Sequence, residues 1–151
     1  MGDKGRVVLP KTFRNIIKEA SGQRVLCLMK HPRWKCLSAF GLERKLTLED
    51  QIDREERNAI DRGQDFDREM RAFQLFGFLE VGFDDSGRFI LPDHLARLAN
   101  ISDGIYFNGG GREFTLWAPE ELSRMGAGWE AAQANCDSLI AETGSKSGGR
   151  K

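Results

Sequence analysis

The sequence predicts a mostly β fold with flanking helices, of the α+β class, in which one small unit is written twice. The segment GDKGRVVLP at residues 2–10 returns as DDSGRFILP at residues 84–92. The two copies lie 82 residues apart, which is longer than the period of about 20–50 residues expected of solenoids and propellers. Each copy is surrounded by short segments that are apolar or that alternate apolar and polar residues, with turn-forming residues between them. This pattern is typical of strands.

The second copy has the clearer boundaries. Apolar and polar residues alternate over 78–83, which predicts a strand, and Gly87 has the conformational freedom for a turn over 84–87. Pro92 suits the first turn of a helix, where its missing N–H costs nothing. The other elements expected here are a strand at 88–91, a helix at 92–100, a strand at 104–107, a hairpin loop at 108–112, a strand at 113–117 and a helix from 119 to about 142.

The first copy predicts the same order of elements. RVVL at 6–9 reads as a strand, and an apolar stripe at helical spacing follows Pro10. That stripe consists of Phe13, Ile16, Ile17 and Ala20. Strands are expected at 24–29 and 36–40, on either side of the turn KHPRWK.

Between the copies, residues 42–77 are rich in Glu, Asp and Arg and only sparsely apolar. Such a segment predicts helices that pack on a neighbour through a thin apolar stripe, here a hairpin broken near Gly63. The expected organisation is a first repeat at 1–43, a charged helical connector at 44–77, a second repeat at 78–122, a C-terminal helix at 123–142 and a disordered Gly/Ser/Lys-rich tail at 143–151.

One strand of the first repeat has no counterpart in the sequence. The equivalent of the strand at 78–83 would precede Met1. We therefore expect that the N-terminus is trimmed, or its start misassigned, by roughly one strand length.

The net charge of zero conceals an uneven distribution. Residues 1–45 carry 11 Lys and Arg against 3 Asp and Glu, a net charge of +8, and the later residues balance it. A basic block of this kind is the footprint expected for binding a polyanion. It is equally consistent with a solvated face that the acidic half of the same chain neutralises.

Several function classes find no support in the sequence. No apolar run approaches the ~20 residues of a membrane span, and no secretory signal begins the chain. The cysteines Cys27, Cys36 and Cys136 lack paired spacing, which favours reduced thiols in a cytoplasmic protein. His31 and His94 show no metal-ligand spacing, and no nucleophile–base pair is present. We expect no enzyme activity, no cofactor, no metal and no small-molecule substrate.

The doubled frame of Gly-Arg, two apolar residues and Leu-Pro, within a strand–turn–strand–helix–strand–strand unit, resembles the SpoVT/AbrB DNA-binding family. Two such units in one chain, joined by charged helices and ending in FTLWAPEEL at 114–122, are similar to the MraZ family. Its members are bacterial transcription regulators of the division and cell-wall gene cluster. The resemblance spans about residues 1–142.

The resemblance implies a double-repeat, swapped-hairpin β-barrel with pseudo-two-fold symmetry, in which the two copies bury each other's apolar faces. It also implies closed rings of subunits, with the helices of 42–77 and 119–142 available for subunit contacts. The family's D-x-x-x-R motif matches Asp84 and Arg88; in the first copy Gly2 stands where the Asp is expected, and Asp3 follows one residue late. The family-motif residues are Asp3, Gly5, Arg6, Asp84, Asp85, Gly87 and Arg88.

The candidate DNA-binding residues are Lys4, Arg6, Lys11, Arg14 and Arg88. Cations beside a helix start suit phosphate, and an arginine can read a guanine edge through two parallel hydrogen bonds. The alternative is that Arg6 and Arg88 pair with turn carboxylates and hold the fold together. We favour DNA contact for Arg6 and the structural role for Arg88. Trp117 is expected in the core, while Trp34 remains open between core and base stacking.

These observations favour a sequence-specific regulator that binds tandem short direct repeats in double-stranded promoter DNA. Its expected state is a cytoplasmic, nucleoid-associated homo-oligomer with no membrane partner and no small-molecule substrate. The rival interpretation is an antitoxin-like protein-interaction module on the same barrel. Two barrel halves and a short tail argue against that rival, because AbrB-like antitoxins usually carry one half and a disordered toxin-binding tail.

Overall fold

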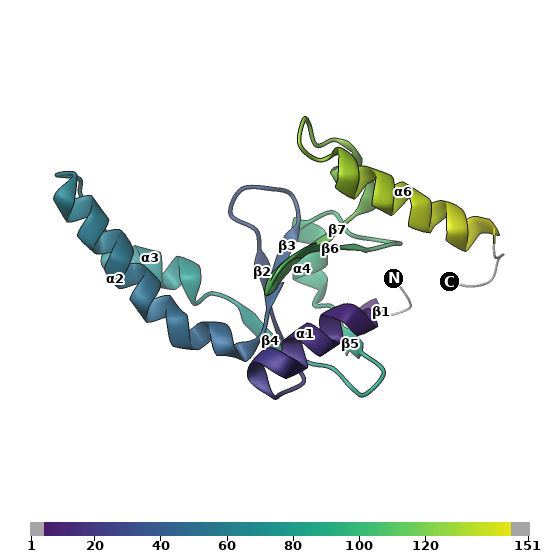
Figure 1. Ribbon diagram of the computed structural model, residues 1–151, viewed down its shortest axis with the longest axis horizontal. Coiled ribbons are helices and arrows are strands. Elements are labelled where there is room, and N and C mark those ends of the chain that lie inside the picture. Colours follow the sequence, from purple (N-terminus) through teal and green to yellow (C-terminus); the bar gives the residue numbers. More distant parts are fainter. Residues whose placement is uncertain (1–4, 146–151) are drawn as a thin grey trace.

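The computed structural model describes residues 5–145. The elements of the first half are β1 (Arg6–Val8), α1 (Lys11–Ser21), β2 (Val25–Lys30), β3 (Leu37–Phe40), the short 3-10 helix η2 (Leu42–Arg44), α2 (Lys45–Asp61) and α3 (Arg68–Leu75) (Figure 1). Those of the second half are β4 (Leu79–Gly82), β5 (Arg88–Ile90), α4 (Asp93–Leu98), β6 (Tyr106–Gly110), β7 (Glu113–Trp117), α5 (Pro119–Ser123) and α6 (Glu130–Ser145).

The α+β class is confirmed, but the expectation of a mostly β fold is wrong. Helices hold more of the described residues than strands do. The reason lies in α2 and α6, which are long and rich in residues with high helix propensity such as Ala, Glu and Arg. These two helices outweigh the short strands of the repeats.

The eight-residue pattern repeated at 3–10 and 85–92, here called the octet, supplies both strands of a small sheet. β1 and β5, one from each copy, pair as an antiparallel two-stranded ribbon. Matching backbone hydrogen bonds close its two ends: the Leu9 N–H donates to the Gly87 carbonyl at 2.8 Å, and the Leu91 N–H donates to the Gly5 carbonyl at 2.8 Å. The sequence is written twice because each copy is the pairing partner of the other.

The remaining strands form a five-stranded sheet in the order β4-β2-β3-β7-β6. The two copies also meet here, because β3 of the first pairs antiparallel with β7 of the second, and Ser38 lies opposite Thr115. β4 of the second copy pairs with β2 of the first. Among the described residues both sheets are open, so the assigned strand pairs do not form a closed barrel.

The core lies between the ribbon, the sheet and the short helices. Val7, Leu9, Phe89 and Leu91 are buried together with Phe114 of β7. Burying one such side chain contributes about 1.5–3 kcal/mol, and the four ribbon residues come in equal numbers from the two copies of the octet. Neither repeat therefore has a complete core without the other.

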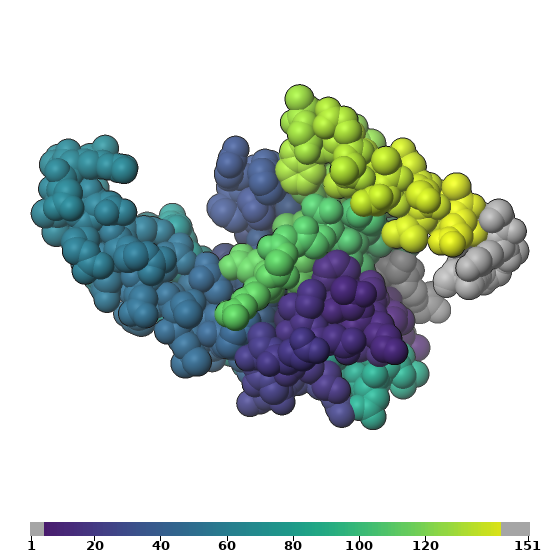
Figure 2. Space-filling view, viewed as in Figure 1, coloured from purple at the N-terminus to yellow at the C-terminus, as the bar shows by residue number. Residues whose placement is uncertain are grey.

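Helix α1 lies beside the β6–β7 hairpin on the surface (Figure 2). Phe13 of α1 packs on Phe107 and Phe114, with ring centroids 5.8 and 4.6 Å apart. The hairpin itself differs from expectation. Asn108 and Gly110 belong to β6 instead of the loop, and Gly111, with φ +89°, allows a two-residue turn.

The expected helical hairpin is present in α2 and α3. The chain breaks after Asp61, where Gly63 has φ +66°, and Asp67 caps α3 by accepting a hydrogen bond from the Met70 N–H at 3.0 Å. Helix α3 buries no residue completely. Ion pairs such as Arg71 with Glu55 (2.6 Å) join it to α2, and together the helices project from the rest of the molecule (Figures 1 and 2).

The single helix expected from 119 to 142 is wrong. Helix α5 ends at Ser123 and α6 begins only at Glu130, because Gly126 and Gly128 lie between them and Gly128 has φ +99°. Helix α6 then continues to Ser145, three residues into the predicted tail. Residues 146–151 of that tail lie outside the described residues.

Helix α6 is held by an aromatic cluster. Trp117 is fully buried, as expected, and Trp129 packs against it and against Trp34. Trp34 is also stacked on His31, with ring centroids 4.5 Å apart. The structure therefore places Trp34 in a packed cluster, and Cys36 and Cys136 are buried free thiols in the same cluster.

Candidate nucleic-acid interface

The outer face of the β1–β5 ribbon carries two arginines and two aliphatic residues. Arg6, Val8, Arg88 and Ile90 are exposed, while the alternating positions are buried. The register places Arg6 opposite Ile90 and Val8 opposite Arg88. The major groove of DNA admits a two-stranded ribbon, where arginine can bind guanine and an aliphatic side chain can contact the thymine methyl group.

The Asp84–Arg88 motif forms a closed turn in the second copy. The Asp84 carboxylate accepts hydrogen bonds from the backbone N–H groups of Ser86 and Arg88, each at 2.9 Å, and from Arg88 Nε at 2.7 Å. The backbone N–H and the guanidinium of Arg88 hold the pKa of Asp84 below its usual range. Arg88 therefore pairs with a carboxylate of its own turn, and its role in holding the fold together stays a prediction.

Asp85, the second carboxylate of this turn, does not pair with Arg88. It forms an ion pair with Arg24 at 2.5 Å instead of with Arg88. Arg88 itself remains 70% exposed, so the pairing with Asp84 leaves most of its side chain on the outer face of the ribbon.

Gly87 is required by both conformation and space. Its φ is +85°, and a Cβ atom there would lie 2.5 Å from the Leu9 carbonyl oxygen and 2.6 Å from Arg14 Nε. Gly5 is in the same situation, because its φ is +77° and a Cβ atom there would lie 2.8 Å from the Leu91 carbonyl oxygen. Only glycine permits the two copies to approach this closely.

Arg14 spans the junction between the copies. Its Nε donates to the Leu9 carbonyl at 3.0 Å and its Nη1 to the Asp85 carbonyl at 3.2 Å. The structure therefore uses two donors of this predicted DNA-binding residue within the protein, fastening α1 to the turn of the second copy.

Two cations beside the start of the first copy's helix are exposed. Arg6 and Lys11 are exposed and take part in no ion pair within residues 5–145. The first turn of α1 contains no acidic residue, whereas α4 has Asp93 there, bonded to Arg97. Because a helix N-terminus carries partial positive charge, the α1 side of the ribbon is the better surface for phosphate. Lys4 and Asp3 lie outside the described residues.

Sequence reasoning did not single out Val8 and Ile90. The signal was present in the alternation of RVV and RFI, where the middle residue faces inward and the outer two share the opposite face. An apolar run of this kind is ordinarily assigned to the core, and only the pairing of β1 with β5 shows which side is solvent-exposed.

Comparison with known proteins identifies several relatives named "Transcriptional regulator MraZ". One from Gluconacetobacter diazotrophicus is 30% identical over 148 residues, covering 97% of this chain and 89% of the relative. One from Parvibaculum lavamentivorans is 33% identical over 119 residues, covering 77% and 69%. One from Oenococcus oeni is 28% identical over 130 residues, covering 85% and 82%. No protein-family model matches the chain.

Proposed function

Because the chain belongs to the MraZ family of transcriptional regulators, we propose that it binds double-stranded DNA sequence-specifically through the outer face of the β1–β5 ribbon. The observation that carries the proposal is the exposed Arg6 on that face, without an ion pair among residues 5–145. A guanidinium that no carboxylate of residues 5–145 occupies is available for the O6 and N7 atoms of guanine. Lys11, at the start of α1, binds the phosphate backbone.

The DNA target consists of tandem short direct repeats upstream of the division and cell-wall gene cluster. One ribbon is small and makes few contacts, so a single site binds weakly. Several subunits in a closed ring engage several repeats at once. The high effective concentration of the linked ribbons makes the overall binding of the ring to DNA tight. A regulator of this kind is located in the cytoplasm and associates with the nucleoid.

Exposed apolar residues support the proposed ring. Met70 and Phe73 of α3 are 52% and 67% exposed, and Ile60 of α2 is 68% exposed. On the projecting helices they offer an apolar surface that a neighbouring subunit can cover.

The pseudo-two-fold, swapped-hairpin barrel is part of the same proposal, supported by the pairing of β1 with β5 and of β3 with β7. No helix among the described residues is long and apolar enough to cross a membrane.

The test is fluorescence anisotropy with duplex DNA that carries the tandem repeats from upstream of the gene, against a scrambled duplex, from about 50 to 200 mM salt. We expect tight binding to the repeats alone, weakened by Arg6→Gln. The matched control is Arg62→Gln, which removes an exposed arginine at the far end of α2. Equal affinity for both duplexes, or equal loss in the two variants, would contradict the proposal.

A further inference from the structure

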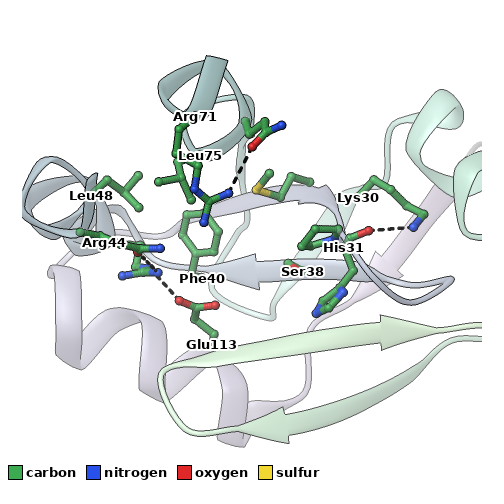
Figure 3. Close-up of a pocket in the computed structure, with 13 residues that line it drawn as sticks. Lys30, His31, Ser38, Phe40, Arg44, Leu48, Arg71, Leu75 and Glu113 are labelled. Carbon is green, nitrogen blue, oxygen red and sulfur yellow. Dashed lines mark hydrogen bonds and ion pairs between the residues drawn. The ribbon is translucent and has the colours of Figure 1, made fainter. Parts of the chain in front are cut away.

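A pocket of about 690 Å³ lies between the projecting helices and the five-stranded sheet (Figure 3). Phe40 of β3 forms part of its floor, Leu48 of α2 and Leu75 of α3 lie on the helical side, and Lys30 and His31 line the end formed by the β2–β3 hairpin. Pockets that hold small molecules have volumes of about 300–1,000 Å³. The volume and the mixture of apolar and polar walls both fall within the range of a ligand site.

The charges around the pocket do not balance. Three cations, Lys30, Arg44 and Arg71, line it together with one carboxylate, that of Glu113. Arg44 Nε pairs with Glu113 Oε2 at 2.6 Å. Arg71 Nε pairs at 2.6 Å with Oε1 of Glu55, a residue that does not line the pocket. Two of the cations are therefore neutralised by carboxylates.

Among residues 5–145, no carboxylate forms an ion pair with Lys30, the third cation of the pocket. Its Nζ donates to the His31 carbonyl at 2.8 Å and to the Trp34 carbonyl at 2.7 Å, and both of these acceptors are neutral. An ammonium group has three donors, so one N–H of Lys30 is available to an anion. Burial and the charges of Lys30 and Arg33 lower the pKa of the neighbouring His31, so the imidazole adds no second charge near neutral pH.

Lys30 and the apolar residues of the pocket lie at opposite ends. In Figure 3, Leu48, Phe40 and Leu75 lie toward one end, beside the two paired arginines, and Lys30 lies at the other. We propose that this pocket binds a small amphipathic monoanion, a single carboxylate or sulfonate on an apolar body. The anionic group binds the Lys30 ammonium, and the apolar body packs on Phe40, Leu48 and Leu75.

The occupant would connect two parts of the molecule that otherwise share few contacts. Helix α3 buries no residue completely, and the pocket wall that it supplies, with Arg71, Gln74 and Leu75, faces the sheet across the cavity. A ligand that fills the cavity therefore packs α3 against β3. The pocket lies away from the ribbon, so its occupancy does not depend on DNA binding.

A pair of fluorescent probes tests the proposal on the full chain. The probes are 1-anilinonaphthalene-8-sulfonate and its neutral analogue N-phenyl-1-naphthylamine, which differ only in the sulfonate. We expect one sulfonate probe bound per chain, with weaker binding of the neutral analogue. Lys30→Gln should weaken the sulfonate probe about tenfold, the factor typical of losing one charge-assisted hydrogen bond, and leave the neutral analogue unchanged.

Two further variants separate the pocket from the exposed apolar surface. Gln74→Trp places a large side chain at the pocket wall from an exposed helical position and should weaken both probes even if Lys30→Gln affects folding. Phe73→Gln removes an exposed apolar side chain of the same helix that does not line the pocket and should change neither probe. Absence of binding, or binding that Phe73→Gln abolishes and Gln74→Trp spares, would overturn the assignment.

Discussion

Val7 lies directly opposite Phe89 at the centre of the β1–β5 ribbon, and these two residues occupy the same position in the two copies of the octet. In each flanking pair an arginine of one copy lies opposite an aliphatic residue of the other, Arg6 opposite Ile90 and Arg88 opposite Val8. Both central side chains are buried. The ribbon is thus formed by each copy pairing with the other, and its outer face repeats the order of arginine and aliphatic residue on both strands.

Substitution of Gly87 by alanine should destabilise the fold strongly. The new Cβ would lie 2.5 Å from the Leu9 carbonyl oxygen, which adds about 1–3 kcal/mol of overpacking to the cost of a left-handed conformation. Gly22→Ala is the control, because Gly22 has φ +74° but a Cβ atom there would have no neighbouring atom within 4 Å. That substitution should lower the free energy of unfolding by only about 1–2 kcal/mol, the cost of the left-handed conformation. Urea denaturation of both variants measures the difference, and equal losses would show that the close approach has no energetic consequence.

Arg14→Gln should affect stability more than DNA binding. The substitution removes the bonds from Arg14 to the Leu9 and Asp85 carbonyls, and hydrogen bonds made by charged groups contribute about 1.5–3 kcal/mol. We expect a lower urea midpoint and an unchanged salt dependence of DNA affinity. A reduced salt slope with unaltered stability would assign Arg14 to phosphate contact instead.

Arg6 and Arg88 should contribute unequally to DNA affinity. Arg6→Ala is expected to weaken specific binding by about tenfold or more, as for loss of one bidentate base contact. Arg88→Ala should have a smaller effect, because its Nε is already bonded to Asp84 at 2.7 Å. Anisotropy titrations on the same duplex compare them, and a larger loss at Arg88 would place the reading side on the second copy.

The salt dependence of binding should report few phosphate contacts per subunit. If Lys11 and neighbouring cations neutralise about three to four phosphates, the slope of log K against log salt lies between about −2.7 and −3.6 per ribbon. Lys11→Gln should reduce the magnitude of this slope by about 0.9 and leave sequence preference unchanged. A slope that Lys11→Gln does not alter would show that α1 faces away from the DNA.

Acidification should destabilise the cluster around His31. His31 Nδ1 accepts the backbone N–H groups of Arg33 at 3.0 Å and Trp34 at 3.2 Å, and burial lowers the pKa of the imidazole from 6.5. The imidazole of His31 is therefore protonated more readily in the unfolded chain than in the folded one. The stabilisation that neutral His31 provides is present above about pH 6.5 and is lost as the pH falls toward the folded pKa. Thermal melts between about pH 7.5 and 5.5 measure the loss, and His31→Asn, which keeps an acceptor without titrating, should lessen the pH dependence.

Local features of this protein follow from its amino-acid sequence alone. Backbone preferences over a few residues account for the turn glycines Gly5 and Gly87, the helix starts just after Pro10 and Pro92, and the break near Gly63. The buried position of Trp117 was also evident from its apolar strand. The helix assigned across 126–128 shows the limit, because two glycines there ended one helix and allowed another.

The packing of distant segments decides which side chains are available to bind a ligand. Arg14 and Arg88 resemble Arg6 in sequence, yet Arg14 is bonded to carbonyls of both copies and Arg88 to Asp84, while Arg6 has no ion pair among the described residues. The pocket beside Lys30 likewise combines α2, α3, β3 and the β2–β3 hairpin. The pair of Arg88 with Asp84 was evident from the D-x-x-x-R spacing, but the bond from Arg14 to Asp85 and the walls of the pocket depend on proximity in space, which spacing along the chain does not encode.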